Sequence, residues 1–364
     1  VSETLCIIFV RSTFVFALYL SLFVLIMSEF HPDSIRNDTD SKTLSRLSMM
    51  RTKDRDLVIL LGSIQTACKL IARSVRKAGI AGLYGLHGAE NATGDEQKKL
   101  DVLSNEMFVN SLYNSHACAV LVSEENEDPI IVPEHMAGKY CVAFDPLDGS
   151  SNIDCNVSTG TIFAVWEKKS TGPATVADIL RPGNEIVCAG YCAYGSATEL
   201  VLTYGHGVER FTLDPSIGEF IMTAENMTLP AEEKLIYSIN EGNYLTWDPC
   251  MQAAVDDFKQ KKPKPYSARY VGSMVADVHR TLMYGGIYMY PADVAKGNGK
   301  LRILYEGFPM SMIMEQAGGS ASTGMFKGKI TRLLDLVPSG IHDKCPVLIG
   351  STRDVDRVKA YYNK

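Results

Sequence analysis

Two aspartates flank a short turn, and their spacing suits a site that binds a cation and a phosphate together. The segment FDPLDGSSN at 144–152 follows an apolar run and contains Asp145 and Asp148. Because Gly149 has no side chain, the backbone N–H groups of Gly149 and Ser150 can approach an anion closely. Two carboxylates beside such amides suit a hard cation that bridges to a phosphate. Taken alone, Asp-Pro and Asp-Gly pairs also fit a plain turn.

A second apolar run ends in adjacent acids. Glu124 and Glu125 follow the residues VLVS at 120–123. Neighbouring carboxylates at a strand end repel each other unless a cation binds them. If the two acid-tipped strand ends lie side by side, four carboxylates surround one point. This pattern predicts a metal cluster. The competing interpretation of Glu124 and Glu125 alone is a solvated loop, because the polar residues 126–128 follow.

Further acids could complete such a cluster. Asp95 follows a glycine-rich stretch at 82–94, and Asp101 follows it closely. A carboxylate on a mobile loop could close over a metal ion and orient a water molecule. The alternative is that both acids belong to the first turn of a helix. Glu306 ends the apolar run 301–305 and has no special claim by itself.

Cationic, hydroxyl and amide side chains of the second half could hold a distal phosphate. Taken singly, each is more typical of a surface charge or a half-buried tyrosine. The candidates are Lys300, Arg302, Arg269, Tyr270, Tyr290 and Asn240.

The composition is that of a globular protein. The chain has 364 residues, of which 46% are hydrophobic and 21% charged, with a net charge of −6. An acidic balance argues against nucleic acid as a partner. The 9 cysteines form no CxxC pair and indicate reduced thiols inside the cell. The 7 histidines include no HxxxH pair, which argues against a zinc hydrolase.

Apolar periodicity and turn residues predict an alternation of helices and strands. Helices are expected at 57–78, 98–113, 248–261, 275–283, 309–316 and 351–362. Strands are expected at 118–122, 140–144, 161–166, 186–191, 235–239, 286–290 and 301–305, with a hairpin formed by 199–203 and 207–213.

The sequence divides into an extension, an arm and two domains. Residues 1–26 are apolar and precede the first methionine, Met27. We expect them to be absent from the native protein, with a signal anchor as the alternative. Residues 27–56 read as a flexible polar arm. Two folded domains are expected to follow, at 57–227 and 228–364.

These motifs together resemble class I fructose-1,6-bisphosphatase, from about Leu57 to the C-terminus. The segment DPLDGSSNID at 145–154 is similar to the signature of the magnesium-dependent, lithium-sensitive sugar and inositol phosphatases. The segments ARYVGSMVADVHRT at 268–281 and NGKLRILYE at 298–306 narrow the resemblance to the bisphosphatase. The resemblance implies a layered αβαβα sandwich, an α+β or α/β fold of the sugar phosphatase type. It also implies homotetramers and no membrane partner. The domain at 57–227 would carry the metal site and an allosteric site, and the domain at 228–364 would bind the sugar bisphosphate.

The resemblance also implies roles for individual residues. Two or three Mg²⁺ ions per subunit, with Mn²⁺ as a possible substitute, would bind to Glu124, Glu125, Asp145, the carbonyl of Leu147, Asp148 and Glu306. Catalytic roles fall to Asp95, Asp101 and Glu125. Substrate would be held by Gly149, Ser150, Ser151, Asn240, Arg269, Tyr270, Ser273, Met274, Tyr290, Lys300 and Arg302, with Arg269 reaching into a neighbouring subunit.

The implied reaction is hydrolysis of the 1-phosphate of D-fructose 1,6-bisphosphate by metal-activated water, a step of gluconeogenesis in the cytoplasm. A peroxisome-like organelle is the alternative location. Three other functions stay open. The protein could be a sedoheptulose-bisphosphatase, an inositol-phosphate phosphatase or a membrane-tethered binding protein without catalytic activity.

AMP is the expected allosteric inhibitor, with Lys139 and Tyr140 in its site. The sequence departs from the family pattern around that site. The residues KDRDLV at 53–58 replace a stretch rich in glycine and threonine, and Glu167 stands where an arginine is expected. We therefore predict inhibition by AMP through a rearranged phosphate site, weaker than in vertebrate enzymes. A further departure is Asn243 in place of a tyrosine at the distal phosphate.

Overall fold

An eight-stranded sheet carries both acid-tipped segments. The computed structural model describes residues 42–90 and 96–363. The predicted extension at 1–26 and the loop acid Asp95 lie outside the described residues. The strand order is β10 (Glu219–Ala224), β9 (Glu209–Asp214), β8 (Thr198–Thr203), β7 (Cys188–Tyr194), β6 (Thr159–Glu167), β5 (Tyr140–Asp148), β3 (Cys118–Ser123) and β4 (Ile130–Ile131).

A second main sheet has six strands. Their order is β12 (Ser267–Ala268), β11 (Ile236–Ser238), β13 (Ile287–Tyr290), β18 (Val347–Gly350), β15 (Ser320–Phe326) and β16 (Lys329–Arg332). Two smaller pairs join β1 (Leu86–Glu90) to β2 (Glu96–Lys98) and β14 (Leu301–Arg302) to β17 (Lys344–Cys345).

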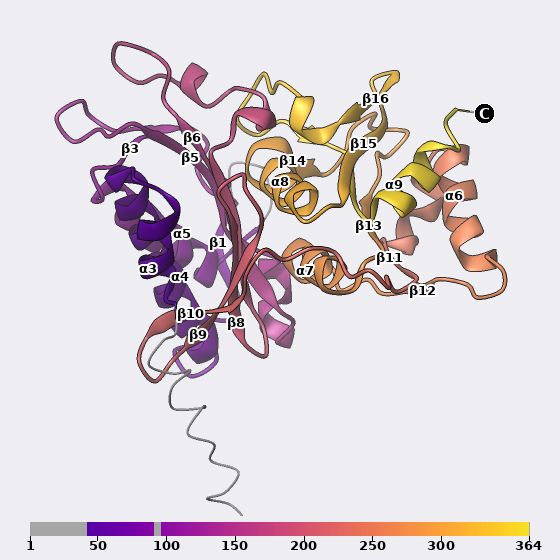
Figure 1. Cartoon of the computed structure of the whole chain (residues 1–364), viewed down its shortest axis with the longest axis horizontal. Helices are drawn as coiled ribbons and strands as arrows, with labels where there is room; N and C mark the ends of the chain where they lie inside the picture. The colour runs from indigo at the N-terminus through magenta and orange to yellow at the C-terminus, as the bar shows by residue number, and fades with distance from the viewer. Residues whose placement is uncertain (1–41, 91–95, 364) are drawn as a thin grey trace, which may run out of the picture. The chain divides into compact units, whose positions relative to one another are not determined.

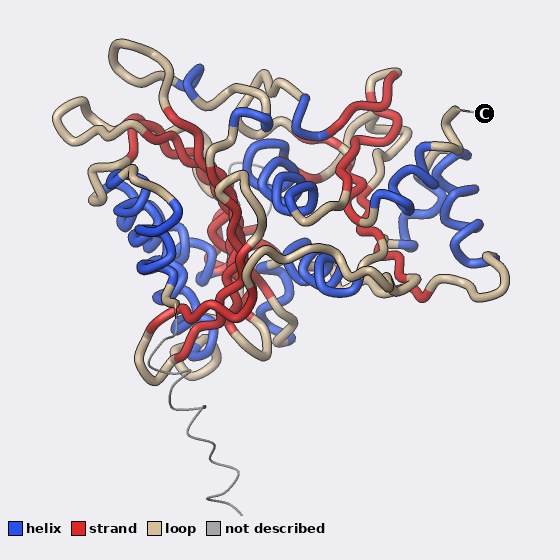
Figure 2. Tube along the Cα trace, viewed as in Figure 1, coloured by secondary structure: helices blue, strands red, loops and turns tan. Residues whose placement is uncertain are grey.

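Helices cover both faces of each main sheet, so the described residues from Thr43 onward form five layers (Figure 1). Helices α3 (Leu44–Arg51), α4 (Arg55–Lys77) and α5 (Lys99–Tyr113) cover one face of the eight-stranded sheet. Helices α7 (Met274–Tyr284) and α8 (Phe308–Gln316) lie between the sheets, and α6 (Pro249–Gln260) and α9 (Thr352–Lys359) form the outer layer. Figure 2 shows the resulting alternation of helix and strand layers. The predicted αβαβα sandwich is confirmed.

Three hydrophobic layers hold these elements together. The first joins α3, α4 and α5 to one face of the large sheet, and the second fills the space around α7 and α8 between the sheets. The third packs α6 and α9 on the outer face of the small sheet. Every residue of β5 is buried, because both faces of the large sheet are covered. The acids at the end of β5 are therefore taken out of water by the fold itself.

One described helix is long and apolar enough to cross a membrane by length and composition alone. It is α4, Arg55–Lys77. Its apolar residues recur at helical spacing, and one face, including Leu60, Ile64 and Ile71, is buried against the first hydrophobic layer. Its pattern is therefore that of an amphipathic core helix.

Two expectations from the sequence were wrong. Part of the expected flexible arm forms α3, because Leu44 and Leu47 share one helical face and are buried, and Thr43 caps the N-terminus. The expected strand at 301–305 stops after Arg302 and continues as one π-helical turn, Ile303–Gly307. The Phe308 N–H donates to the Ile303 carbonyl and closes this turn, and the Arg302 N–H donates to the Glu306 carboxylate at 2.5 Å.

We predict that Gly160→Ala destabilises the protein by about 1–3 kcal/mol, because it overpacks the contact between the large sheet and α7. A Cβ added at Gly160 would lie 2.6 Å from Val275 Cγ1 and 2.8 Å from the Cys192 carbonyl oxygen. The matched control is Gly172→Ala, where a Cβ meets no atom within 4 Å. Its expected effect is below about 0.5 kcal/mol. Urea unfolding of both variants measures the difference, and equal midpoints would contradict the prediction.

Candidate active site

The two acid-tipped strands end side by side. Strands β3 and β5 pair in parallel, with Ser123 opposite Phe144, so their carboxyl ends meet at one edge of the sheet. The Glu124 N–H donates to the Phe144 carbonyl at 3.1 Å and extends this pairing by one residue. Glu124 and Asp145 are consequently neighbours although 20 residues of chain lie between them.

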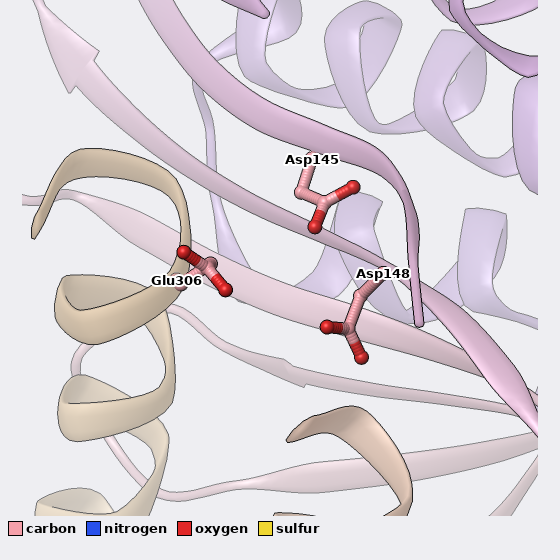
Figure 3. A group of neighbouring side chains, drawn as sticks. All are labelled: Asp145, Asp148 and Glu306. Atoms are coloured by element: carbon pink, nitrogen blue, oxygen red, sulfur yellow. The ribbon is translucent and has the colours of Figure 1, made fainter. Parts of the chain in front are cut away.

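A third segment brings Glu306 to the same point. Carboxylate oxygens of Asp145, Asp148 and Glu306 lie within 4.8 Å of one another, and all three residues are buried. Figure 3 shows Asp145 and Asp148 at the end of β5 and Glu306 facing them from the turn that precedes α8. Hard oxygen donors in this arrangement are the ligand set that a divalent cation such as Mg²⁺ prefers. The residues present therefore fit a metal ion.

Backbone and hydroxyl groups fix the orientation of each carboxylate. Asp148 Oδ2 accepts from the Val275 N–H at 2.9 Å and from Ser273 Oγ at 3.1 Å, at the N-terminus of α7. Asp145 Oδ1 accepts from the Leu147 N–H at 2.9 Å. These bonds hold the side chains in place before any ligand arrives, which reduces the reorganisation that binding would require.

One cation already lies beside the cluster. Arg302 is 4% exposed, and its guanidinium lies 3.2 Å from Glu124 Oε1. It compensates part of the negative charge that Glu124, Asp145, Asp148 and Glu306 would carry together. A single guanidinium cannot neutralise four carboxylates, so the site retains a strong attraction for added cations.

Burial and mutual repulsion raise the carboxyl pKa values. Burial, followed by the charge of Glu124, raises the pKa of Asp145 well above its usual range. Burial raises the pKa of Asp148 to about 6, although the bond from Val275 opposes the shift. Burial raises the pKa of Glu306 to about 8 against the opposing charge of Arg302. Without a metal ion, part of this cluster is therefore protonated near neutral pH.

Asp101 reaches the same space from α5. Its Oδ2 accepts from the Lys98 N–H at 2.8 Å, the reciprocal bond of a helix N-terminus. The side chain is 2% exposed, and burial raises the pKa of Asp101 to about 6. Asp101 thus lies in the first turn of a helix, which was the alternative to a mobile loop in the sequence analysis. It also lines the site cavity.

A cavity of about 480 Å³ lies over the cluster and extends to the basic and aromatic residues of the second half. Gly149 borders it with φ of 76°, and a Cβ there would lie 2.9 Å from Ser273 Cβ, so only glycine fits this turn. Most residues singled out in the sequence line the cavity. They are Asp101, Glu124, Glu125, Asp145, Leu147, Asp148, Gly149, Ser150, Ser151, Asn240, Tyr270, Met274, Tyr290, Lys300, Arg302 and Glu306.

Two other predicted substrate residues do not line this cavity. Arg269 is exposed, and its guanidinium donates to the carbonyl of the adjacent Ala268 at 2.9 Å. Ser273 is buried, and its hydroxyl donates to Asp148, so it helps to position that carboxylate. The predicted role of each residue stays a prediction.

Sequence reasoning missed Asp277, which organises the loop beside the cavity. This fully buried carboxylate accepts from the N–H groups of Val271 and Gly272 at 3.0–3.1 Å and from Ser238 Oγ at 2.7 Å. Arg280 donates to it at 2.6 Å. Asp277 occupies a helical position inside the ARYVGSMVADVHRT segment, where an acid before a basic residue resembles an ordinary surface pair.

The residues assigned to an AMP site, Lys139 and Tyr140, both contact one carboxylate of the chain itself. Lys139 Nζ forms an ion pair with Asp54, and Tyr140 Oη donates to the same oxygen at 2.7 Å. Asp54 also caps α4 by accepting from the N–H groups of Asp56 and Leu57. Burial would raise the pKa of Asp54, but the bonds from Lys139 and Tyr140 outweigh it, and the pKa falls to about 2.

Comparison with known proteins identifies the family. Residues 42–225 match the family model "Fructose-1-6-bisphosphatase, N-terminal domain", and residues 229–363 match the C-terminal domain model. The cytosolic fructose-1,6-bisphosphatase of Arabidopsis thaliana is 56% identical over 311 residues, which cover 84% of this chain and 89% of the relative. The cytosolic enzyme of Beta vulgaris is 52% identical over 331 residues, covering 89% and 95%. The crystal structure of Leishmania major fructose-1,6-bisphosphatase in holo form superposes with a TM-score of 0.84 at 46% identity, covering 89% of this chain and 99% of that one.

We predict that the metal-free protein loses stability as the pH rises from about 4 to 8, and that saturating divalent cation removes most of this loss. The folded-state pKa values of Asp148 and Asp101, about 6, and of Glu306, about 8, lie above those of the unfolded chain. The folded state therefore binds more protons than the unfolded state in this window, and its stability falls with pH.

Thermal unfolding with a chelator and with excess Mg²⁺, at pH 5.5 and 8, measures the effect. The metal-induced rise in Tm should be larger at pH 8. In Asp145→Asn, which removes one of the repelling charges, the metal-free protein should be more stable at pH 8 and the metal-induced rise smaller. Equal metal-induced shifts at both pH values would contradict the charge argument.

Proposed function

The chain belongs to the fructose-1,6-bisphosphatase family, and from this premise we propose that it hydrolyses the 1-phosphate of D-fructose 1,6-bisphosphate to fructose 6-phosphate and phosphate. The observation that carries the proposal is the convergence of Asp145, Asp148 and Glu306 in a cavity that Lys300 and Tyr290 also line. Such a cavity could bind the reacting phosphate at the metal-binding carboxylates and a second phosphate at the cationic and hydroxyl groups.

The acidic end would hold divalent ions through Asp145, Asp148, Glu306, Glu124 and Glu125. We propose Mg²⁺, two or three ions per subunit, because all the side-chain donors are carboxylates. When bound, such ions neutralise the phosphoryl oxygens and the leaving oxygen and lower the pKa of water. The Leu147 carbonyl, which also lines the cavity, is proposed as a further ligand.

The chain's own groups would orient and activate the reactants. The N–H groups at Gly149 and Ser150 border the cavity next to Asp148 and would donate to the 1-phosphate. Asp101, with its pKa raised to about 6, is partly ionised near neutral pH and could accept the proton of the attacking water. Glu125 lies on the same cavity and is proposed to share this role with Asp101.

The opposite end of the cavity would fix the sugar and its 6-phosphate. Lys300, Tyr270, Tyr290 and Asn240 all line it and supply donors suited to a phosphate. Met274 also lines the cavity and is proposed to contact the sugar ring. Binding at this end would hold the reacting phosphate at the acidic end, which converts binding energy into positioning.

Arg269 is proposed to act on a neighbouring subunit in a homotetramer. Its exposed guanidinium contacts only a backbone carbonyl of its own segment among the contacts described, so it can reach outward. The curated relatives are named cytosolic, and we propose the cytoplasm as the location in preference to a peroxisome-like organelle.

AMP is proposed as an inhibitor that must displace Asp54. A phosphate bound by Lys139, Tyr140 and the N-terminus of α4 would compete with a carboxylate that already contacts all three. Glu167, 3.7 Å from Lys139, adds a second negative charge. The internal competitor supports weak inhibition.

Asp148→Asn tests the catalytic proposal. The change removes the charge of one proposed metal ligand, while the amide oxygen can still accept from Val275 and Ser273. We expect kcat for fructose 1,6-bisphosphate to fall more than tenfold, which is a loss above about 1.4 kcal/mol. Phosphate release with varied Mg²⁺ measures it, and Asp214→Asn in the remote β9–β10 turn is the matched control. A variant that keeps more than about a tenth of the activity would refute the metal assignment.

Asp54→Ser tests the regulatory proposal. Serine retains the N-cap of α4 but removes the carboxylate, so the AMP concentration for half-inhibition should fall severalfold. In Lys139→Ala the inhibition should be lost. AMP titrations of the three proteins at fixed substrate decide the matter. Inhibition that Lys139→Ala leaves unchanged would exclude this site, as would an absence of inhibition at millimolar AMP in both wild type and Asp54→Ser.

A further inference from the structure

His342 lies between two segments that carry proposed metal ligands. Its Nδ1 is 2.7 Å from Tyr305 Oη, and Tyr305 immediately precedes Glu306. Its Nε2 is 3.0 Å from the Asn126 carbonyl oxygen and 3.3 Å from that of Glu127, directly after the acidic pair Glu124–Glu125. One imidazole thus contacts both acidic segments, which lie far apart in the sequence.

The chemistry of the partners fixes the proton on the neutral ring. Both groups near Nε2 are carbonyl oxygens, which only accept, so Nε2 must carry the hydrogen. In neutral His342, Nδ1 is then an acceptor, and the Tyr305 hydroxyl donates to it. Two hydrogen bonds therefore run in one direction. Tyr305 Oη donates to His342 Nδ1, and His342 Nε2 donates to the Asn126 carbonyl.

The backbone holds His342 firmly to the Glu306 side. The Ile303 N–H donates to the Asp343 carbonyl at 2.8 Å, and β17 pairs with β14, so that Arg302 lies opposite Lys344. Tyr305 itself is fully buried. The residues around His342 consequently run beside the turn that carries Glu306. The imidazole connects this turn to the backbone at Asn126.

A second set of bonds holds the acidic pair from the α5 side. Asn105 Nδ2 donates to Asn126 Oδ1 at 2.9 Å, and Ser123 Oγ donates to Asn105 Oδ1 at 2.7 Å. The Glu125 N–H donates to Ser123 Oγ at 3.2 Å. The Glu124–Glu125 segment is therefore held on one side by α5, and on the side of Glu306 His342 adds a link to the ion pair between Arg302 and Glu124.

We propose that His342, acting through Tyr305 and the Asn126 carbonyl, is a positioning residue that sets the distance between the Glu124–Glu125 pair and Glu306 and so determines metal affinity. The inference rests on the proposed metal-dependent function. Groups that hydrogen-bond to a metal ligand commonly change metal affinity by about 10–100-fold. His342 contacts neighbours of the ligands, so the lower end of this range is expected. Loss of this link should not change kcat once metal saturates the site, because the metal ions then occupy the same positions.

The test measures metal binding directly, without substrate. Mn²⁺ binding to the whole chain is followed by electron paramagnetic resonance for wild type, His342→Ala, His342→Gln and Tyr305→Phe. We expect Kd to rise at least tenfold in His342→Ala and about threefold in Tyr305→Phe. In His342→Gln, whose amide can donate near the position of Nε2, most of the affinity should return. The exposed His135 provides the control His135→Ala, with unchanged Kd.

A split between metal affinity and turnover separates positioning from general destabilisation. In Tyr305→Phe, kcat at saturating metal should stay within twofold of wild type while the metal concentration for half-maximal rate rises. If His342→Ala does not fold, Tyr305→Phe and His342→Gln carry the test. Wild-type Mn²⁺ affinity in the folded variants overturns the proposal, and so does recovery in His342→Gln no better than in His342→Ala. A wild-type protein that binds no Mn²⁺ would instead refute the proposed metal function.

Discussion

The repulsion among buried carboxylates is the interaction on which the site depends. Asp145, Asp148 and Glu306 are withdrawn from water with oxygens within 4.8 Å of one another, and Arg302 supplies one compensating charge nearby. Left to itself, such a cluster opposes folding, and the raised pKa values of Asp148 and Glu306 express that cost. The rest of the molecule must supply enough packing to hold the carboxylates together until cations arrive.

The five-layer architecture meets this demand by burying the cluster where the end of β5 meets the start of α7. Strand β5 is buried throughout, and α7 starts against its end, so that the Val275 N–H and Ser273 hydroxyl reach Asp148. The close approach at Gly160 allows α7 to lie this near the sheet. Asp277, in the same helix, likewise accepts hydrogen bonds from backbone N–H groups of the loop that borders the cavity.

Local periodicity and acid-tipped apolar runs predicted most helices, the central strands and the acids of the cavity, because these patterns are visible along the chain. The layered sandwich and the roles of the remaining lining residues followed from the family resemblance. Contacts that depend on distant partners were not visible. The run at 301–305 reads as a strand, but the chain leaves the strand path after Arg302, where the Phe308 N–H donates to the Ile303 carbonyl and the Arg302 N–H donates to Glu306. Leu44 and Leu47 gave too short a pattern to indicate α3 within a polar stretch. Asp277 and His342 act across the fold, so no spacing in the sequence marks them.

The same carboxylate chemistry appears twice in the chain with opposite consequences. In the active-site cluster, acids outnumber nearby cations, so the fold favours the arrival of added positive charge. At the start of α4, Asp54 meets Lys139, Tyr140 and two backbone N–H groups, so its charge is already matched. An anion that approaches this second place must replace a carboxylate whose pKa has fallen to about 2, whereas a cation that approaches the first replaces only protons. The balance of charge within each cluster, rather than the residue types alone, therefore determines which of the two places is open to a ligand.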